Sequence, residues 1–161
     1  KSGVSLAILI REAAKMIKSY AGEKQIDLEV PTEIIHDKVY ADKDMMSQVI
    51  INLLSNAVKY TLSGGKVTIA SEVDDAEGLI RVAVTDTGVG IPPEDVEHVF
   101  DKFYRVDDNK KYAKGTGLGL NLVQQIVEKL HGGQVFVESE VGSGSTFGFE
   151  IPLAVKQLQA V

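Results

Sequence analysis

A pair of β-branched runs separated by only five residues is the feature that most limits how this chain can fold. The first run, KVTIASEV, covers residues 66–73, the second, LIRVAVTD, covers residues 79–86, and the acidic segment DDAEG lies between them. Valine, isoleucine and threonine favour strands, and a short polar segment between two such runs is typical of a β-hairpin. The sequence therefore predicts two antiparallel strands here.

The remaining segments predict a second hairpin and three helices. QVFVESE (134–140) and STFGFEIP (145–152) flank the turn VGSG. Amphipathic periodicity predicts helices over residues 5–22, ended by Gly22, over 44–62, capped by Asp42 or Asp44, and over 117–131. Short strands are expected over residues 25–31 and 39–42. Helices and hairpins that do not alternate as βαβ units favour an α+β two-layer sandwich.

The composition limits the classes of protein to which the chain can belong. Its 161 residues are 44% apolar and 25% charged, which is typical of a single globular domain over residues 1–161. The net charge of −6 disfavours a general nucleic-acid binder, and the absence of cysteine excludes disulfides, thiolate metal sites and cysteine nucleophiles. No apolar run reaches the roughly 18 residues of a membrane span. Because the chain begins at Lys1, we expect it to be part of a longer protein.

The segment NLLSNAVKY (52–60) interrupts an apolar helix with polar side chains on one edge. At 100° per residue, an arc of about 100° holds Asn52, Asn56, Lys59 and Tyr60, beside an apolar arc that must face the core. On this helix alone, an ordinary solvated face is the simpler interpretation. The functional alternative is a polar cavity lined by the amides, with Lys59 supplying charge and Tyr60 a flat ring.

Three glycine-rich segments each have a structural and a functional interpretation. DTGVGIP (86–92) is either a plain turn begun by Asp86, or a place where the backbone lies against a ligand and Asp86 accepts from an amino group. KGTGLGLNL (114–122) opens into a helix and can cradle a phosphate with its backbone amides. No strand precedes its glycines and no P-loop pattern is present, which argues against both of those nucleotide folds. VGSGSTF (141–147) is most simply a hairpin turn.

The stretch 87–119 is too long and too polar for a packed connection, and such loops are usually functional or mobile. Within it, FDKFYRV (100–106) has three aromatic side chains and a basic pair. Either Phe100 and Phe103 anchor the segment to the core, or the segment is a lid whose Arg105 reaches a ligand. Both interpretations can hold together.

Taken in order, five segments of this chain resemble the motifs of one family. NLLSNAVKY, DTGVGIP, FDKFYRV, GTGLGL and GSGSTF resemble the N box, first glycine box, F box, second glycine box and third glycine box of the sensor histidine kinases. The resemblance spans roughly residues 3–153. It implies the ATP-binding catalytic domain shared in outline with gyrase, Hsp90 and MutL, the Bergerat fold. That fold has a mixed, mostly antiparallel sheet of about five strands packed on about three helices, with a flexible ATP lid that would cover about residues 95–116.

The resemblance implies roles in binding the phosphates of ATP and Mg²⁺. Asn56 would bind the metal, and Asn52 and Lys59 would contact the phosphates or metal-bound water. Arg105 would reach the γ-phosphate, so that Asn52, Lys59 and Arg105 would be the catalytic residues. The second glycine box would cradle the phosphate tail through Thr116, Gly117, Leu118, Gly119 and Leu120. These roles suit phosphoryl transfer, in which a protein mainly positions the phosphate and neutralises developing charge.

The resemblance also implies a pocket for the adenine base. Tyr60 would flank the base, and Asp86 would accept from its exocyclic amine, helped by a water held by Thr146. Glycine lets a backbone pass close to a ligand. The other residues with this implied position are Gly88, Gly90 and Ile91.

One position separates a kinase from the related ATPases. In those ATPases a glutamate that activates water lies four residues before the metal-binding asparagine, and here that residue is Asn52. An amide cannot act as a general base at neutral pH, so attack by water is disfavoured. A histidine kinase is therefore the first hypothesis. An ATPase of the gyrase and Hsp90 type, or a nucleotide-binding interaction module without chemistry, is the alternative.

The three histidines lack the H-E-x-x-x-P context of a phosphoacceptor. His131 is interpreted as a helix-end residue, where positive charge is favourable, and His98 as a surface residue of the lid; His36 also has no such context. The phosphoacceptor and dimerisation domain is thus expected outside this chain, in a homodimeric parent, with a response regulator as an indirect partner. The domain is expected in the cytoplasm, whether or not its parent is anchored in a membrane. We expect this chain alone to bind Mg-ATP and barely to autophosphorylate.

Overall fold

A computed structural model describes residues 1–31, 38–102 and 119–153 of the chain. Its elements follow one another in chain order, with one π-helical segment labelled η2. They are β1 Ser2–Ser5, α1 Leu6–Glu23, β2 Asp27–Glu29, β3 Lys38–Ala41, α2 Lys43–Tyr60, β4 Lys66–Asp74, β5 Leu79–Asp86, α3 Pro93–Val96, α4 Gly119–Gln124, η2 Gln125–Leu130, β6 Gln134–Glu140 and β7 Gly144–Pro152.

The main sheet has five strands in the order β2-β4-β5-β7-β6. Both predicted hairpins are present: β4 pairs with β5 and β6 with β7, each antiparallel. The only parallel pair in the described sheet is β2 with β4. The expected mixed, mostly antiparallel sheet is confirmed.

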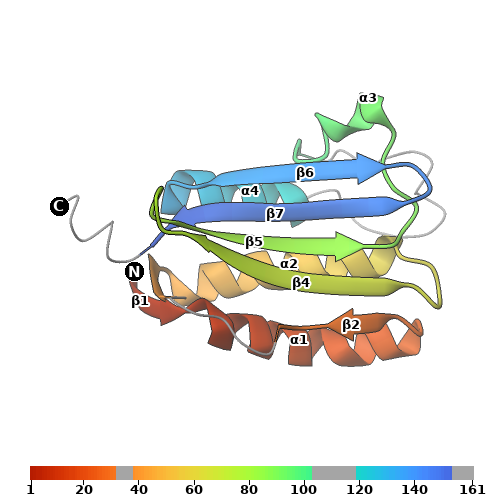
Figure 1. The fold of residues 1–161 in the computed structure, drawn as a ribbon, viewed down its shortest axis with the longest axis horizontal. Coiled ribbons are helices and arrows are strands. Elements are labelled where there is room, and N and C mark those ends of the chain that lie inside the picture. The colour runs from red at the N-terminus through yellow and green to blue at the C-terminus, as the bar shows by residue number, and fades with distance from the viewer. Residues whose placement is uncertain (32–37, 103–118, 154–161) are drawn as a thin grey trace.

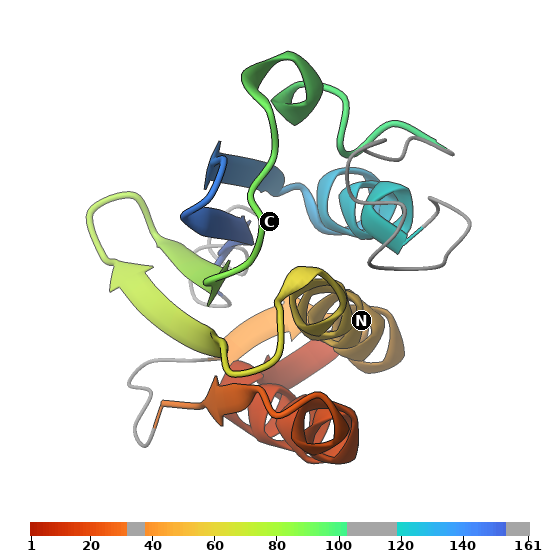
Figure 2. The same ribbon diagram turned by 90° about the vertical axis from the view of Figure 1, so that its right-hand side faces the viewer.

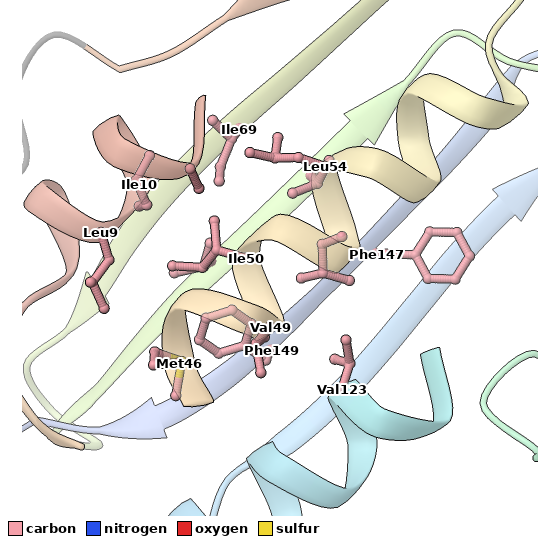
Figure 3. Close-up of a cluster of buried hydrophobic side chains, with 14 of the residues drawn as sticks. Leu9, Ile10, Met46, Val49, Ile50, Leu54, Ile69, Val123, Phe147 and Phe149 are labelled. Carbon is pink, nitrogen blue, oxygen red and sulfur yellow. The ribbon is translucent and has the colours of Figure 1, made fainter. Parts of the chain in front are cut away.

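The helices α1, α2 and α4 cover one face of this sheet, which gives the predicted two-layer α+β sandwich (Figures 1 and 2). Buried residues alternate with more exposed ones along β3, β5 and the first half of β4. The buried strand residues meet the apolar arcs of the helices (Figure 3). Burying each large apolar side chain contributes about 1.5–3 kcal/mol. The fully buried side chains at the centre include Leu9, Ile10, Met46, Ile50, Leu54, Ile69 and Phe149. The helix α2 lies between α1 and α4 (Figure 2), and Asn52 on its polar edge bonds to Gly119 at the start of α4.

Several boundaries differ from the sequence-based expectation. Gly22 lies inside α1, which ends at Glu23; the left-handed position after the helix is held by Gln25, with φ of 58°. The strand β1 was not expected, because it forms by pairing with β3 and not by a β-branched run of its own. Asp42 is the N-cap of α2, and its side chain accepts from the backbone N–H of Met45 at 3.0 Å. No helix among the described residues is long and apolar enough to cross a membrane.

His131 closes the helical segment that ends at η2, and it does so as a neutral ring. It is buried, and the backbone N–H of Asp42 donates to its Nε2 at 3.0 Å. A ring nitrogen that accepts carries no proton, so the proton lies on Nδ1, which donates to the Ile126 carbonyl oxygen at 2.8 Å. Burial lowers the pKa of His131 below its ordinary value. The expectation of a favourable positive charge at this helix end is therefore wrong.

This buried ring gives the domain a predictable pH dependence. Since the pKa of His131 is lowered on folding, the unfolded chain takes up a proton at a higher pH than the folded chain does. The contribution of the neutral ring to the free energy of unfolding is therefore complete above pH about 6.5, and it is lost as the pH falls through the folded-state pKa. We expect a loss of about 1 kcal/mol, the worth of the Asp42 hydrogen bond. Urea unfolding at a series of pH values between 8 and 5 measures this loss in the free energy of unfolding. The His131→Gln variant should be less stable at pH 8 and should show a shallower decline, and an equally steep decline would contradict this assignment.

Candidate nucleotide-binding site

The polar edge of α2 is partly accessible, whereas the rest of the helix faces the core. Asn52, Asn56, Lys59 and Tyr60 are all half-buried. The apolar residues beside them are buried, and they include Met46, Val49, Ile50, Leu53, Leu54, Ala57 and Val58. The edge is therefore a polar strip on the margin of the core, as the periodicity predicts.

One end of this strip contacts the second glycine segment. The Asn52 Nδ2 amide donates to the carbonyl oxygen of Gly119 at 3.3 Å, across 67 residues of sequence. Gln48, one turn earlier, donates from Nε2 to Asn52 Oδ1 at 2.7 Å. Leu120 follows Gly119 in the first turn of α4 and is half-buried against the core. The structure thus brings together two motifs that the resemblance assigned to the phosphates.

Asn56 and Lys59 lie farther along the strip. Within the described ranges, the Asn56 amide makes no hydrogen bond and the Lys59 ammonium no ion pair. The backbone carbonyls of Val58 and Lys59 accept from Lys24 Nζ at 2.7 and 2.9 Å, which closes the end of α2. An amide oxygen is a hard ligand suited to Mg²⁺, which keeps several waters and needs few protein ligands. Asn56 therefore fits a metal that is held mostly by phosphates and water.

The other end of the strip meets a buried carboxyl group. Asp86 ends β5 with 5% of its surface exposed, and its Oδ1 accepts from the backbone N–H groups of Gly88 at 2.9 Å and Ser145 at 3.1 Å. Burial raises the pKa of Asp86, against the opposing effect of these two donors. Both interpretations of the residue are compatible with this geometry, because Oδ1 begins the turn while Oδ2 accepts no hydrogen bond from any described residue.

The glycines of the first glycine segment are required by contacts within the protein. A Cβ on Gly88 would overlap the carbonyl oxygen of Tyr60, and a Cβ on Gly90, with φ of +76°, would overlap that of Glu140. The N–H of Val89 donates to the Tyr60 carbonyl at 3.3 Å, which ties this segment to the end of α2. These glycines therefore let backbone pack against backbone, a reason for their presence that the sequence alone did not indicate.

Ile91 lies at the border of this segment and the third glycine segment. It is buried, and its N–H donates to Ser139 Oγ at 2.8 Å. Nearby, the N–H of Gly142 donates to the Val89 carbonyl at 3.0 Å. The turn between β6 and β7 therefore supports the first glycine segment from one side.

Thr146 lies on the opposite face of the sheet from Asp86. It pairs with Thr85 in the register of β5 and β7, and the two hydroxyls lie 3.0 Å apart on the outer face. Ser145 is the residue opposite Asp86, and both are buried on the helix-covered face. The placement of Thr146 beside Asp86 is therefore wrong by one residue, because neighbouring residues of a strand point to opposite faces. The strict alternation from Phe147 back to Ser145 is the signal that could have found it.

Part of the predicted site lies outside the described residues. This applies to Arg105, Thr116, Gly117 and Leu118, and to most of the expected lid over 95–116. Phe100 is described; it is buried and packs edge-on against Phe147, with ring centroids 6.1 Å apart. Asn121 of α4 donates to the Phe100 carbonyl at 3.0 Å. The anchoring role expected for Phe100 is confirmed.

Comparison with known proteins agrees with this geometry. The model of the family "Histidine kinase-, DNA gyrase B-, and HSP90-like ATPase" matches residues 41–155. The sensor histidine kinase WalK of Bacillus subtilis is 43% identical over 120 residues, which cover 74% of this chain and 20% of WalK. The chain therefore spans about a fifth of the length of this relative.

Solved structures give the same result. The catalytic domain of histidine kinase ThkA has a TM-score of 0.78 and 36% identity, covering 95% of this chain and 97% of that domain. ThkA in complex with the response regulator protein TrrA has a TM-score of 0.79 at 31% identity, over 97% of this chain and 42% of ThkA. Full-length ShkA in complex with AMPPNP has a TM-score of 0.77 at 32% identity, over 95% of this chain and 31% of ShkA. The chain belongs to the histidine kinase-, DNA gyrase B- and HSP90-like ATPases, and within them to the catalytic domains of the histidine kinases.

Proposed function

We propose that this domain binds Mg-ATP along the polar edge of α2 and transfers its γ-phosphoryl group to a histidine on a separate dimerisation and phosphoacceptor domain of the same protein. The observation that carries the proposal is the arrangement at the two ends of that edge. A buried carboxyl group lies at one end, and an asparagine bound to the second glycine segment lies at the other. Asn52 and Tyr60 are eight residues apart, or about 12 Å along the helix. That span suits a nucleotide with its base at one end and its phosphates at the other.

Asp86 would select the base. A buried carboxylate oxygen without a donor is costly, so Oδ2 favours a ligand that donates, as the exocyclic amine of adenine does. Ser145 lies beside Asp86 on the same face, and its hydroxyl contacts that of Ser139 at 2.7 Å. We assign to Ser145 the position beside the base that was first given to Thr146. Tyr60 and Ile91 would complete the pocket.

The other end would hold the phosphates. Lys59 would supply positive charge and Asn56 would hold Mg²⁺. Arg105 and residues 116–120 would contact the phosphate tail. Mg²⁺, when bound, neutralises phosphate charge. Asn52 is an amide and cannot take a proton from water, so the site favours storing the γ-phosphate over hydrolysing it.

In the transfer, an imidazole nitrogen of the phosphoacceptor forms a bond to the γ-phosphorus as the bond to the leaving ADP oxygen breaks. This reaction needs a second domain, which we place elsewhere in the parent protein, where it would also form the homodimer. The phosphoryl group would then pass to a response regulator. Because the reaction consumes ATP, we place the domain in the cytoplasm.

Labelling with γ-phosphate-labelled ATP tests this function. The parent's phosphoacceptor domain, added separately, should become labelled with an acid-labile phosphate, while the 161-residue chain alone takes up little. The Asn56→Asp variant should bind Mg-ATP with altered affinity and label the acceptor more slowly. Strong labelling of the isolated chain, or equal labelling with and without the acceptor's histidine, would contradict the proposal.

A further inference from the structure

Gln48 takes part in a hydrogen-bonded chain that ends at the second glycine segment. Gln48 and Asn52 are four residues apart, and thus adjacent on one edge of α2. Gln48 Nε2 lies 2.7 Å from Asn52 Oδ1, and Asn52 Nδ2 lies 3.3 Å from the carbonyl oxygen of Gly119. Gln48 is exposed, and neither the periodicity of the helix nor the motifs assigned it a role.

The polarity of this chain is fixed by its last member. A backbone carbonyl oxygen can only accept, so Asn52 must present its NH₂ group to Gly119. The Asn52 oxygen then faces Gln48, which must in turn present its own NH₂ group. If Asn52 alone turned over, its oxygen would face the Gly119 oxygen and its NH₂ group would face that of Gln48, so both bonds would be lost. The Gly119 carbonyl therefore sets the orientation of the Asn52 amide, and the hydrogen bond from Gln48 stabilises that orientation.

We propose that Gln48 is a positioning residue of the nucleotide site: by donating to Asn52 Oδ1 it keeps the Asn52 amide turned toward Gly119 and so holds the start of α4 against α2. The inference rests on the proposed function, because it deepens the role of a residue placed at the phosphate end. Gln48 itself does not touch the nucleotide. Its effect passes through Asn52 to the glycine segment that follows the lid.

The Gln48→Leu variant removes this donor without adding charge. Net hydrogen bonds of this kind are worth about 0.5–1.5 kcal/mol, so we expect the affinity for Mg-ATP to fall about threefold to tenfold. The matched control is Gln124→Leu, which removes the same amide from a half-buried position on α4 where the structure shows no hydrogen bond to the side chain among the described residues. The control should bind within twofold of the unaltered chain. Gln124→Leu should unfold at the same urea concentration as the unaltered chain, and Gln48→Leu at the same or a slightly lower one, because the lost bond is present without nucleotide.

Hydrogen exchange of the Asn52 side-chain amide, followed in ¹⁵N-resolved NMR spectra, distinguishes positioning of this amide from a general effect on stability. In the nucleotide-free chain one of the two protons should be protected from exchange by Gly119, and Gln48→Leu should abolish that protection. Unchanged protection, or an affinity that matches the control, would overturn the proposal. If the unaltered chain bound no Mg-ATP, the proposed function would fail, and the amide signals would still decide the role of Gln48.

Discussion

Replacing Gly90 with alanine should be among the most damaging single changes in the described part of the site, and we expect it to lower the free energy of unfolding by about 3–5 kcal/mol. Two effects combine. The backbone φ of +76° is unfavourable for any residue with a Cβ, and that Cβ would overlap the carbonyl oxygen of Glu140. Because the obstacle is backbone, a rotamer change cannot relieve it.

The control for Gly90→Ala is Gly132→Ala. Gly132 has a similar φ of +65°, but a Cβ there meets no atom within 4 Å. It should therefore show only the conformational cost of about 1 kcal/mol. Chemical unfolding measures the free energy of unfolding of both variants. Equal losses in the two variants would show that the contact with Glu140 does not contribute to the effect.

Replacing Asp86 with asparagine should separate binding from stability. The asparagine keeps an oxygen for the N–H groups of Gly88 and Ser145, so the turn is preserved. The raised pKa of Asp86 means that its ionised form is disfavoured by folding; this penalty is present at neutral pH and disappears when the carboxyl is protonated at low pH. The neutral variant should therefore be at least as stable as the unaltered chain at pH 7.

The same substitution puts an NH₂ group in the place of Oδ2, so that it faces the position that the proposal gives to the exocyclic amine of adenine. Two donors that face each other in a buried site leave both unpaired, and we expect the affinity for ATP to fall about 100-fold. Titration with ATP, beside a urea unfolding curve, measures both quantities. The control is Thr146→Val on the opposite face of the sheet, which should leave ATP affinity within twofold. A loss of affinity in Thr146→Val equal to that in Asp86→Asn would refute the placement of the base.

Local patterns in the sequence were enough to predict most of the fold. The alternation in residues 66–73 and 79–86 fixes which side chains are buried, and the short connection fixes the pairing, so the hairpin appeared as predicted. The arc of Asn52 and Asn56 on α2 followed from helical periodicity. Both features depend only on residues close together in the chain.

Features that depend on distant residues were missed. β1 exists because β3 offers it a partner. At the end of the π-helical η2, His131 Nδ1 bonds to the Ile126 carbonyl oxygen and the N–H of Gly133 donates to the Val127 carbonyl oxygen. The other nitrogen of the His131 ring accepts from the N–H of Asp42, which is distant in the sequence. The assignment of Thr146 instead of Ser145 was an error of one residue, which in a strand reverses the face. The role of Gln48 needed the position of Gly119, which no local pattern gives.

A single ³¹P NMR experiment on the unaltered chain with ATP and Mg²⁺ tests the central claim most directly, because one spectrum reports both binding and hydrolysis. We predict shifted and broadened β- and γ-phosphate signals that depend on Mg²⁺, and inorganic phosphate appearing far more slowly than the roughly 1 per second typical of enzymes. Unperturbed ATP signals would contradict binding at this site. Shifted signals with phosphate released at about 1 per second or faster would contradict a site that keeps its γ-phosphate for a histidine.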